Sequence, residues 1–309
     1  MNLQLLTSIT NDTLKAATPL ILAATGELIA EKSGVFNLGV EGMMLVGAAS
    51  GFIAAVVTGN IYLALLVSVV AGIIIALIHA VLVITINANQ VASGLALSIF
   101  GSGVSAFIGA EYVGKTIAPL QPLGIPILKS IPIIGALFNQ DILVYTSILL
   151  IILVSWFLHK TRLGLILRSI GESPQSANKL GLKVRQIRYL SVMFGGAMAG
   201  LAGSYLSLAY TPLWAENMAS GKGWIAIALV AFASWKPARI LLGAYLFGGI
   251  SAIQLTLQAI GVNLSPYLLS SFPYIATILV LVIISRDETR LKLQAPASLG
   301  EPFRSSGNW

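Results

Sequence analysis

Cysteine is absent from this sequence of 309 residues, and charged residues make up only 9% of it. The lack of cysteine excludes disulfides, thiolate metal sites and cysteine nucleophiles, and it leaves the redox compartment open. Soluble globular proteins carry about 25% charged residues, which they need to cover their surface. Here 57% of the residues are hydrophobic and the mean hydropathy is +0.90. These values exclude a soluble enzyme, a disordered chain and a coiled coil, and they indicate an all-α, polytopic helical membrane protein.

Apolar stretches of membrane-spanning length recur along the chain. A helix needs about 20 apolar residues to cross the hydrocarbon layer. Seven stretches meet this requirement: 62–86, 142–158, 240–260, 266–284, 41–58, 92–110 and 189–210. Two more are weaker, because 12–31 carries Lys15, Glu27 and Glu31, and 223–235 has only 13 residues. We therefore predict about nine transmembrane helices (eight to ten) in a single domain over residues 1–309.

The distribution of basic residues predicts the orientation of the chain. Residues 160–188 contain 7 of the 18 Lys and Arg residues and a single acid, Glu172. By the positive-inside rule this loop is cytoplasmic. Counting outward from it places the tail 286–309 inside and the N-terminus outside. The net charge of +7 is thus a topology signal and does not indicate a nucleic-acid partner. The start of the chain lacks the basic n-region of a cleavable signal peptide.

One motif matches a nucleotide-binding pattern by chance. Residues 109–116 fit the phosphate-binding loop G-x-x-x-x-G-K-[ST] letter for letter. That loop needs a strand before it and a helix after it, whose N-terminus binds phosphate. Here an apolar span precedes the match, Pro119 and Pro122 follow it, and the topology places it outside. We expect no ATP site, no metal and no cofactor in this chain.

The basic loop contains signals for a short helix. Ser173 is a good N-cap, and Pro174 suits the first helical position, where its missing N–H costs nothing. Gly181 can take the left-handed conformation that ends a helix. The spacing predicts an exposed helix of about seven residues, which is too short to be stable alone in water. The residues alone leave open whether it is a connector on lipid headgroups or a docking site for a cytosolic partner.

Four stretches resemble the permease subunits of nucleoside-type ABC importers, within the branched-chain amino acid and simple-sugar permease superfamily. The first is 26–44, which contains Asn37 and Glu41, and the others are 89–97, 171–203 and 221–237. Together they run through most of the chain, in the order that is typical of the superfamily. The resemblance to the nucleoside branch depends mainly on residues 37–41.

This resemblance implies a multi-pass subunit of the bacterial inner membrane, which works with cytosolic ATP-binding subunits and an extracytoplasmic substrate-binding protein. A second homologous permease is also implied, and the length of the chain favours a heterodimer with a longer sister. Segment 173–181 matches the coupling segment of the family. The residues expected to couple transport to the ATPase are Gly171, Ser173, Pro174, Ala177 and Gly181.

Polar residues in and near the spans are candidates for a substrate pathway. A pathway for nucleosides needs amides, hydroxyls and aromatic faces, and it need not contain a charge. The candidates are Asn37, Glu41, Asn87, Asn89, Gln90, Ser93 and Trp224, with Gln254 as a further one. For Glu41 we favour stabilisation of the N-terminus of its own span over substrate contact.

Two other polar positions have a structural and a functional interpretation. Glu27 and Glu31 lie four residues apart on one helix face, and we favour a salt-bridged cytoplasmic end with Lys32 over a proton relay. His79 lies alone in a long apolar span, and we favour a bond to a neighbouring helix over a substrate contact. A pair of small-residue motifs in 195–203 indicates close helix packing, either inside the bundle, which we favour, or at a dimer interface.

The predicted function is an ABC importer permease for nucleosides or related small polar solutes, without an ATPase site of its own. A simple-sugar or vitamin importer differs only in cargo. An ion-coupled secondary transporter is a further alternative, but it needs titratable groups near the membrane midplane, whereas the acids here lie near predicted span ends. An intramembrane enzyme is disfavoured, because the sequence has no paired membrane Asp, no H-E-x-x-H and no G-x-S-x-G.

Overall fold

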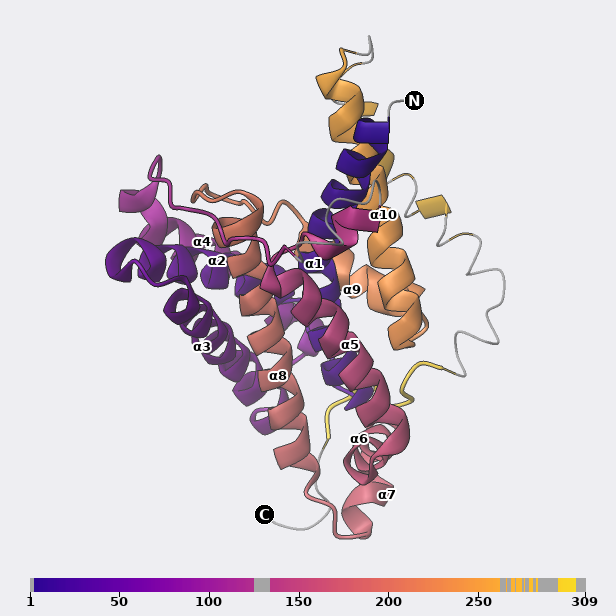
Figure 1. Ribbon diagram of the computed structural model, residues 1–309. Coiled ribbons are helices and arrows are strands. Elements are labelled where there is room, and N and C mark those ends of the chain that lie inside the picture. The colour runs from indigo at the N-terminus through magenta and orange to yellow at the C-terminus, as the bar shows by residue number, and fades with distance from the viewer. Residues whose placement is uncertain are drawn as a thin grey trace.

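The computed structural model describes residues 3–124, 134–261 and 294–303, together with isolated positions between 265 and 282. In these ranges the regular structure is helical, apart from one isolated bridge between Thr116 and Leu213. Seven of the described helices are long and apolar enough to cross a membrane. They are α1 (Leu3–Lys32), α2 (Val40–Thr58), α3 (Ile61–Ala80), α4 (Gln90–Gly109), α5 (Ile142–Lys160), α8 (Val184–Tyr205) and α10 (Pro237–Ala259) (Figure 1). The prediction of a polytopic helical membrane protein is confirmed.

The predicted count of nine spans stays a prediction. The charged stretch 12–31 is the C-terminal two thirds of α1, which packs against α8, α10, α9 and α5 at the centre of the bundle. Stretch 223–235 contains α9 (Lys222–Phe232), a helix of only 11 residues. Stretch 266–284 lies largely outside the described residues. Two spans are extended by π-helical turns, α3 by Val81–Thr85 and α8 by Leu206–Tyr210.

Many of the helix starts follow directly from the sequence. Side chains of Asn60, Asn89, Asp141, Thr161 and Ser173 accept backbone N–H groups at the starts of α3, α4, α5, α6 (Arg162–Glu172) and α7 (Pro174–Lys179). Such caps satisfy donors that the first turn of a helix leaves free. In contrast, α2, α8, α9 and α10 begin without a side-chain cap from the residue that precedes them. The N-terminus of α9 therefore needs a partner from elsewhere in the chain.

Small residues bring α8 into backbone contact with α2 and α3. A Cβ added to Gly196 would clash with Ala76 of α3, and one added to Gly203 would clash with the carbonyl oxygen of Met44 in α2. Close approach of this kind needs glycine, because any side chain would separate the helices. The small-residue motifs of α8 thus serve packing inside the bundle, as favoured from the sequence.

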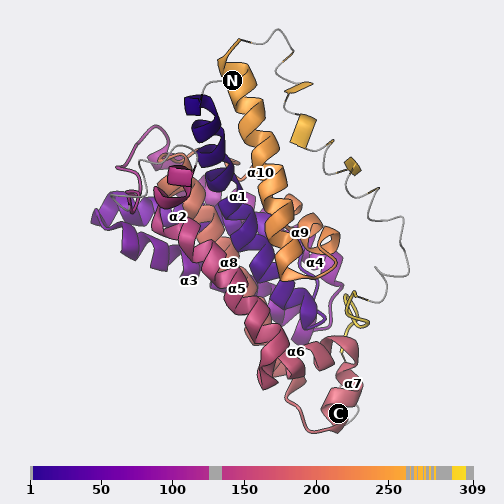
Figure 2. The same ribbon diagram turned by 45° about the vertical axis from the view of Figure 1, so that its right-hand side comes forward.

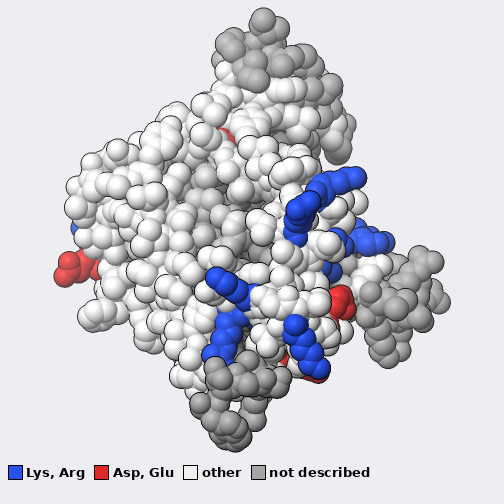
Figure 3. Space-filling view, turned by 90° about the horizontal axis from the view of Figure 1, so that it is seen from below, with Lys and Arg blue, Asp and Glu red and all other residues white. Residues whose placement is uncertain are grey.

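Most of the described basic residues and the two short helices α6 and α7 lie at one end of the bundle. Helices α6 and α7 extend below α5, and the N-terminus of α1 lies at the opposite end (Figures 1 and 2). Seen from the α7 end, Lys and Arg side chains gather on the exposed face (Figure 3). We call this end cytoplasmic by the positive-inside rule and the opposite end outer. The predicted loop 160–188 is mostly helical, since α6, α7 and the first turn of α8 occupy it.

Candidate functional site

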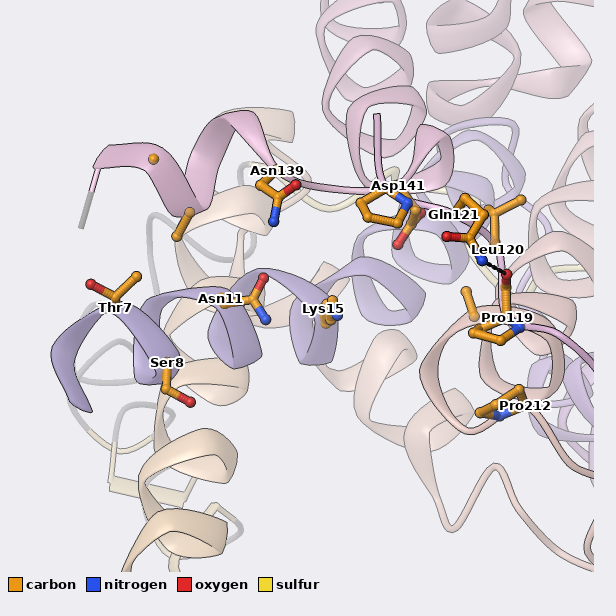
Figure 4. Close-up of a pocket in the computed structure, with 14 residues that line it drawn as sticks. Thr7, Ser8, Asn11, Lys15, Pro119, Leu120, Gln121, Asn139, Asp141 and Pro212 are labelled. Carbon is orange, nitrogen blue, oxygen red and sulfur yellow. Dashed lines mark hydrogen bonds between the residues drawn. The ribbon is translucent and has the colours of Figure 1, made fainter. Parts of the chain in front are cut away.

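A polar cavity of about 490 Å³ opens at the outer end of the bundle (Figure 4). It lies between the N-terminal half of α1, the segments 119–122 and 135–141, and the end of α8. Small-molecule sites typically measure about 300–1,000 Å³, so the cavity has the size of a binding site. Figure 4 shows Asn11 and Lys15 of α1 on one side, with Asn139 and Asp141 across from them. The polar side chains in its wall are those of Thr7, Ser8, Asn11, Lys15, Gln121, Asn139 and Asp141.

Asp141 is the buried acid of this outer cavity. Its Oδ1 accepts hydrogen bonds from the backbone N–H groups of Leu143 (2.9 Å) and Val144 (3.2 Å), and its Oδ2 accepts one from the Tyr205 hydroxyl (3.3 Å). Burial raises the pKa of the Asp141 carboxyl above its ordinary value, and these hydrogen bonds and the charge of Lys15 oppose that rise. The cavity thus offers one fixed acid, one cation and several amides, which suits a hydroxyl-bearing solute.

The corner between α1 and α2, residues 33–39, is held from inside by Glu27 and Asn37. The Oε1 atom of Glu27 accepts the backbone N–H of Asn37 at 3.1 Å. The Asn37 side chain accepts the backbone N–H of Gly39 at 2.8 Å and lies 3.6 Å from the sulfur of Met43. Both Glu27 and Asn37 are 1% exposed. In this structure Asn37 is thus a buried part of a turn.

The same corner is held from α3 and α4. His79 of α3 bonds the carbonyl oxygen of Phe36 through Nε2 and the hydroxyl of Ser93 through Nδ1, both at 3.2 Å. The Gln90 side chain accepts the backbone N–H of Phe36 at 2.7 Å. The expectation that His79 bonds a neighbouring helix is therefore confirmed. His79 and Gln90 bond the two backbone groups of Phe36, and Ser93 bonds His79, so the corner is fixed against two helices.

Both ends of α9 are held by carboxylates. Glu41 accepts the backbone N–H groups of Gly221 (2.7 Å) and Gly223 (2.6 Å), so it caps the N-terminus of α9. The indole N–H of Trp235, just beyond the other end, donates to Glu31. A carboxylate at a helix N-terminus also interacts favourably with the helix dipole. Glu31 and Glu41, both from the 26–44 stretch, thus bond the two ends of α9, which lies almost 200 residues later in the sequence.

This geometry extends one expectation from the sequence and corrects another. Glu41 lies in the first turn of α2, as expected, and its hydrogen bonds go to the N-terminus of α9. Glu27 and Glu31 bond Asn37 and Trp235 instead of forming a salt bridge with Lys32. The reason is that α1 is buried among other helices along this length, so that neutral N–H groups of neighbouring segments are the nearest hydrogen-bond donors to the carboxylates.

Unusual backbone conformations flank α9 on both sides. Among the described residues five non-glycine residues have positive φ, and four of them are Asn217 (54°), Ser220 (49°), Ser234 (51°) and Trp235 (53°). Gly221 is also left-handed, with φ of 82°. Such conformations are uncommon outside glycine and concentrate at functional positions. Helix α9 is therefore a short rigid element between two irregular connections.

The short helix α7 presents one face to the chain and one face outward. Ser173 caps it, Pro174 occupies its first position, and Gly181 follows it with φ of 80°. Ala177 is only 3% exposed, because it packs with Ile170, Val184 and Phe303. The predicted helix is therefore present, but it is not isolated and its Ala177 side chain is not available to a partner. A Cβ on Gly171, just before it, would clash with the carbonyl oxygen of Lys32.

The outward face of α7 ends in an exposed leucine. Gln175, Ser176 and Lys179 are exposed, and Leu180 is exposed to 81%. Gly181 has open space around its Cα.

Comparison with known proteins identifies the family. Residues 9–284 match the permease component of the branched-chain amino acid transport system. The chain belongs to this permease family. A putative glucose ABC transporter permease protein of Haloferax volcanii is 40% identical, over 95% of this chain and 96% of its own length. A guanosine ABC transporter permease protein of Bacillus subtilis is 35% identical over 97% of both chains, and a nucleoside ABC transporter permease protein of Lactococcus lactis is 30% identical over 86% and 89%.

The predicted pathway residues of the permease are spread over several elements. Asn37, Glu41, Gln90 and Ser93 are buried and bonded to the protein, as described above. Asn89 caps α4, and Asn87, with φ of 60°, bonds the carbonyl oxygen of Thr85. Trp224 is 37% exposed on α9. None of these residues belongs to the described wall of the outer cavity, and their role in a pathway stays a prediction.

The outer cavity could not be predicted from the sequence, because its two charged residues were interpreted only as evidence on membrane topology. Lys15 was interpreted as a charge that makes the first span less certain, and Asp141 as a charge of the external loop. Both are indeed near the outer membrane boundary, but the cavity needs α1 beside segment 135–141, which no local pattern reveals. A cation in the first apolar stretch was the one available signal.

The rejected phosphate-loop match has the geometry expected of a chance match in this permease. Helix α4 ends at Gly109, and a turn of 3₁₀ helix covers Ala110–Tyr112. Lys115 lies over the ring of Tyr112, 4.4 Å from its centroid, and 117–124 has no helix. The match thus has neither the strand before it nor the helix after it.

Proposed function

We propose that this permease is the membrane subunit of an ATP-driven importer for a nucleoside. Family membership carries the proposal, because relatives named as guanosine and nucleoside permeases align over most of the chain. The outer cavity supports it, since about 490 Å³ accommodates a nucleoside and its amides, cation and acid suit ribose hydroxyls and base edges. In this proposal the pathway leads from this cavity past the exposed Trp224 at the start of α9 toward the half-buried Asn87 and the exposed Asn89.

A simple sugar is the second candidate for the cargo. It is favoured by the relative named as a putative glucose permease, which has the higher identity of 40%. The two candidates separate in one uptake experiment with the permease and its partner subunits in bacterial cells or proteoliposomes. Labelled guanosine should accumulate with ATP, and unlabelled guanosine but not glucose should compete. Accumulation of labelled glucose, with no uptake of labelled guanosine, would establish the sugar reading instead.

The permease hydrolyses no ATP itself in this proposal and depends on three kinds of partner. These are cytosolic ATP-binding subunits, a second homologous permease, which makes a heterodimer, and an extracytoplasmic binding protein, with the complex in the bacterial inner membrane. We assign α7 as the helix that docks on the ATP-binding subunit, with Gly171, Ser173, Pro174 and Ala177 building it and Gly181 ending it. Its contact surface is the exposed face that includes Lys179 and Leu180.

A single substitution on that face tests the docking assignment. Leu180→Ser removes an 81% exposed side chain and should leave the fold intact, yet uncouple ATP hydrolysis from the loaded binding protein. Loss of one apolar anchor of this size weakens a contact by about 1.5–3 kcal/mol, or roughly tenfold or more in affinity. Leu163→Ser, 66% exposed on α6, is the matched control and should behave as the wild type. Equal stimulation of the ATPase by both variants would contradict the assignment.

A further inference from the structure

Two cavities meet at the cytoplasmic end of α5, where this helix lies beside the start of α10. The first, of about 410 Å³, lies among the ends of α1, α5 and α6 and residues 234–236, and we call it the basic cavity. The second, of about 430 Å³, runs between α5 and α10, and we call it the apolar groove. His159 contributes to the walls of both, so the two spaces adjoin.

The basic cavity concentrates positive charge. Lys32 of α1, Arg168 of α6 and Lys236 before α10 line it, and Glu172 is the one carboxylate among the described residues of its wall. Lys236 is exposed, whereas Lys32 and Arg168 are partly buried. Like charges that converge from three separate segments repel one another, most strongly where they are partly shielded from water. An anion within the cavity would remove this repulsion. The charge balance thus favours an anionic ligand.

Two polar atoms near this cavity have no partner within the described part of the chain. The Nε–H of Arg168 and the Oε1 of Gln294 are buried and unbonded, although both residues line the basic cavity. Buried polar atoms in native proteins nearly always have a partner, so each such atom needs an explanation. A phosphate oxygen would accept from Arg168, and a hydroxyl would donate to Gln294. The Gln294 backbone is fixed nearby, because its carbonyl oxygen accepts the Lys32 amine at 3.1 Å.

The apolar groove has a different chemistry. Ile151, Ile152 and Trp156 of α5 and Leu241 of α10 line it, and Lys160 stands at its cytoplasmic end. Ile152 and Trp156 are exposed to 57% and 59%, on a helix that crosses the membrane. Tryptophan and lysine in this order mark the membrane interface. The groove therefore faces the acyl chains of the cytoplasmic leaflet.

We propose that the basic cavity and the apolar groove together bind one anionic phospholipid with a hydroxylated headgroup, such as a phosphatidylglycerol. Its phosphate lies among Lys32, Arg168 and Lys236, its headgroup hydroxyls reach Gln294, and an acyl chain follows the groove between α5 and α10. The lipid would contact α6 and the segment Ser234–Trp235 at once. It thereby joins the α6–α7 region to the irregular connection after α9. The proposal does not depend on the cargo of the permease.

Lipid binding to the purified full-length protein tests this proposal. Phosphatidylglycerol and phosphatidylcholine are titrated separately in detergent, and bound lipid is counted by native mass spectrometry. The double variant R168Q/K236Q should bind phosphatidylglycerol about thirtyfold more weakly, because each cation lost weakens binding by about fivefold. The control R162Q/R185Q removes two exposed cations outside both cavities and should bind as the wild type. Arg168→Lys, which keeps the charge, should retain most of the affinity and shows that the site still folds.

Three results would overturn the proposal. Equal binding of phosphatidylcholine would show that the basic cavity contributes nothing to recognition. An equal loss of phosphatidylglycerol binding in the R162Q/R185Q control would show that the lipid is attracted by the overall surface charge and not by the basic cavity. Displacement of phosphatidylglycerol by inorganic phosphate at similar concentration would identify a site for a free anion, with no part for the apolar groove. Retention of lipid selectivity in the presence of phosphate is the expected outcome.

Discussion

Replacing Glu41 with Gln should loosen the start of α9 and lower the stability of the whole permease. The carboxylate is 6% exposed and accepts two backbone N–H groups at 2.7 and 2.6 Å, and α9 has no side-chain cap from its preceding residue. An amide keeps one acceptor oxygen but turns an NH₂ group toward the other N–H. One charge-assisted hydrogen bond, worth about 1.5–3 kcal/mol, is lost, together with up to about 2 kcal/mol of helix-dipole interaction.

The expected total is thus about 2–4 kcal/mol, which corresponds to a decrease in the unfolding midpoint of about 3–6 °C for a chain of this length. The measurement is thermal unfolding of the purified permease in detergent, followed by tryptophan fluorescence. The control is Glu111→Gln, which removes an exposed acid from the outer turn and should leave the midpoint unchanged. This control corrects for any general effect of the net charge.

The same variant separates the two interpretations of Glu41. If the carboxylate contacts substrate, Glu41→Gln should change the concentration dependence of uptake and leave the midpoint where it was. If it caps α9, the midpoint falls, and uptake falls with it while the apparent affinity for cargo stays constant. An unchanged midpoint would therefore refute the capping argument.

Three further predictions concern packing, the cytoplasmic end and the rejected motif. Gly203→Ala should destabilise the permease by about 1–3 kcal/mol in thermal unfolding, because the added methyl meets backbone of α2, whereas Gly103→Ala, in open space, should be neutral or stabilising. Arg188→Met should cost about 3 kcal/mol and make segment 294–303 sensitive to protease, unlike Arg185→Met at an exposed position. Lys115→Ala should leave ATP-dependent uptake unchanged; loss of ATP hydrolysis would show that the motif binds nucleotide.

The spans could be predicted from the sequence because each carries its signal locally. A run such as 62–86 or 142–158 is apolar on all sides, and the membrane requires that length whatever the run packs against. Short caps such as Ser173 are local too, and α7 begins where that residue predicted. The weaker case was α1, whose charged residues are accommodated by burial among other helices, a property of the bundle and not of the stretch itself.

The site could be predicted only in part, because its partners are distant in sequence. Glu41 meets α9 about 180 residues later, and Lys15 reaches the cavity formed with Asp141. Hydropathy and spacing identify a carboxylate that needs a partner, but they do not say which N–H will supply it. For this reason the sequence placed Glu41 correctly at the start of α2 but did not reveal its hydrogen bonds to α9.

The chain's late segment completes a structure that its early segment begins. Segment 294–303 lies against the end of α1, where Ser298 bonds Gly171 at 2.9 Å and Arg188 bonds both Ser33 and Ser298. Lys32 precedes its partner Gln294 by 262 residues. At a synthesis rate of about 5–20 residues per second, the end of α1 waits roughly 13–50 s for that partner. The cytoplasmic end therefore closes last during biosynthesis, and until Ser298 is made the Arg188 guanidinium has only the Ser33 carbonyl of these two partners.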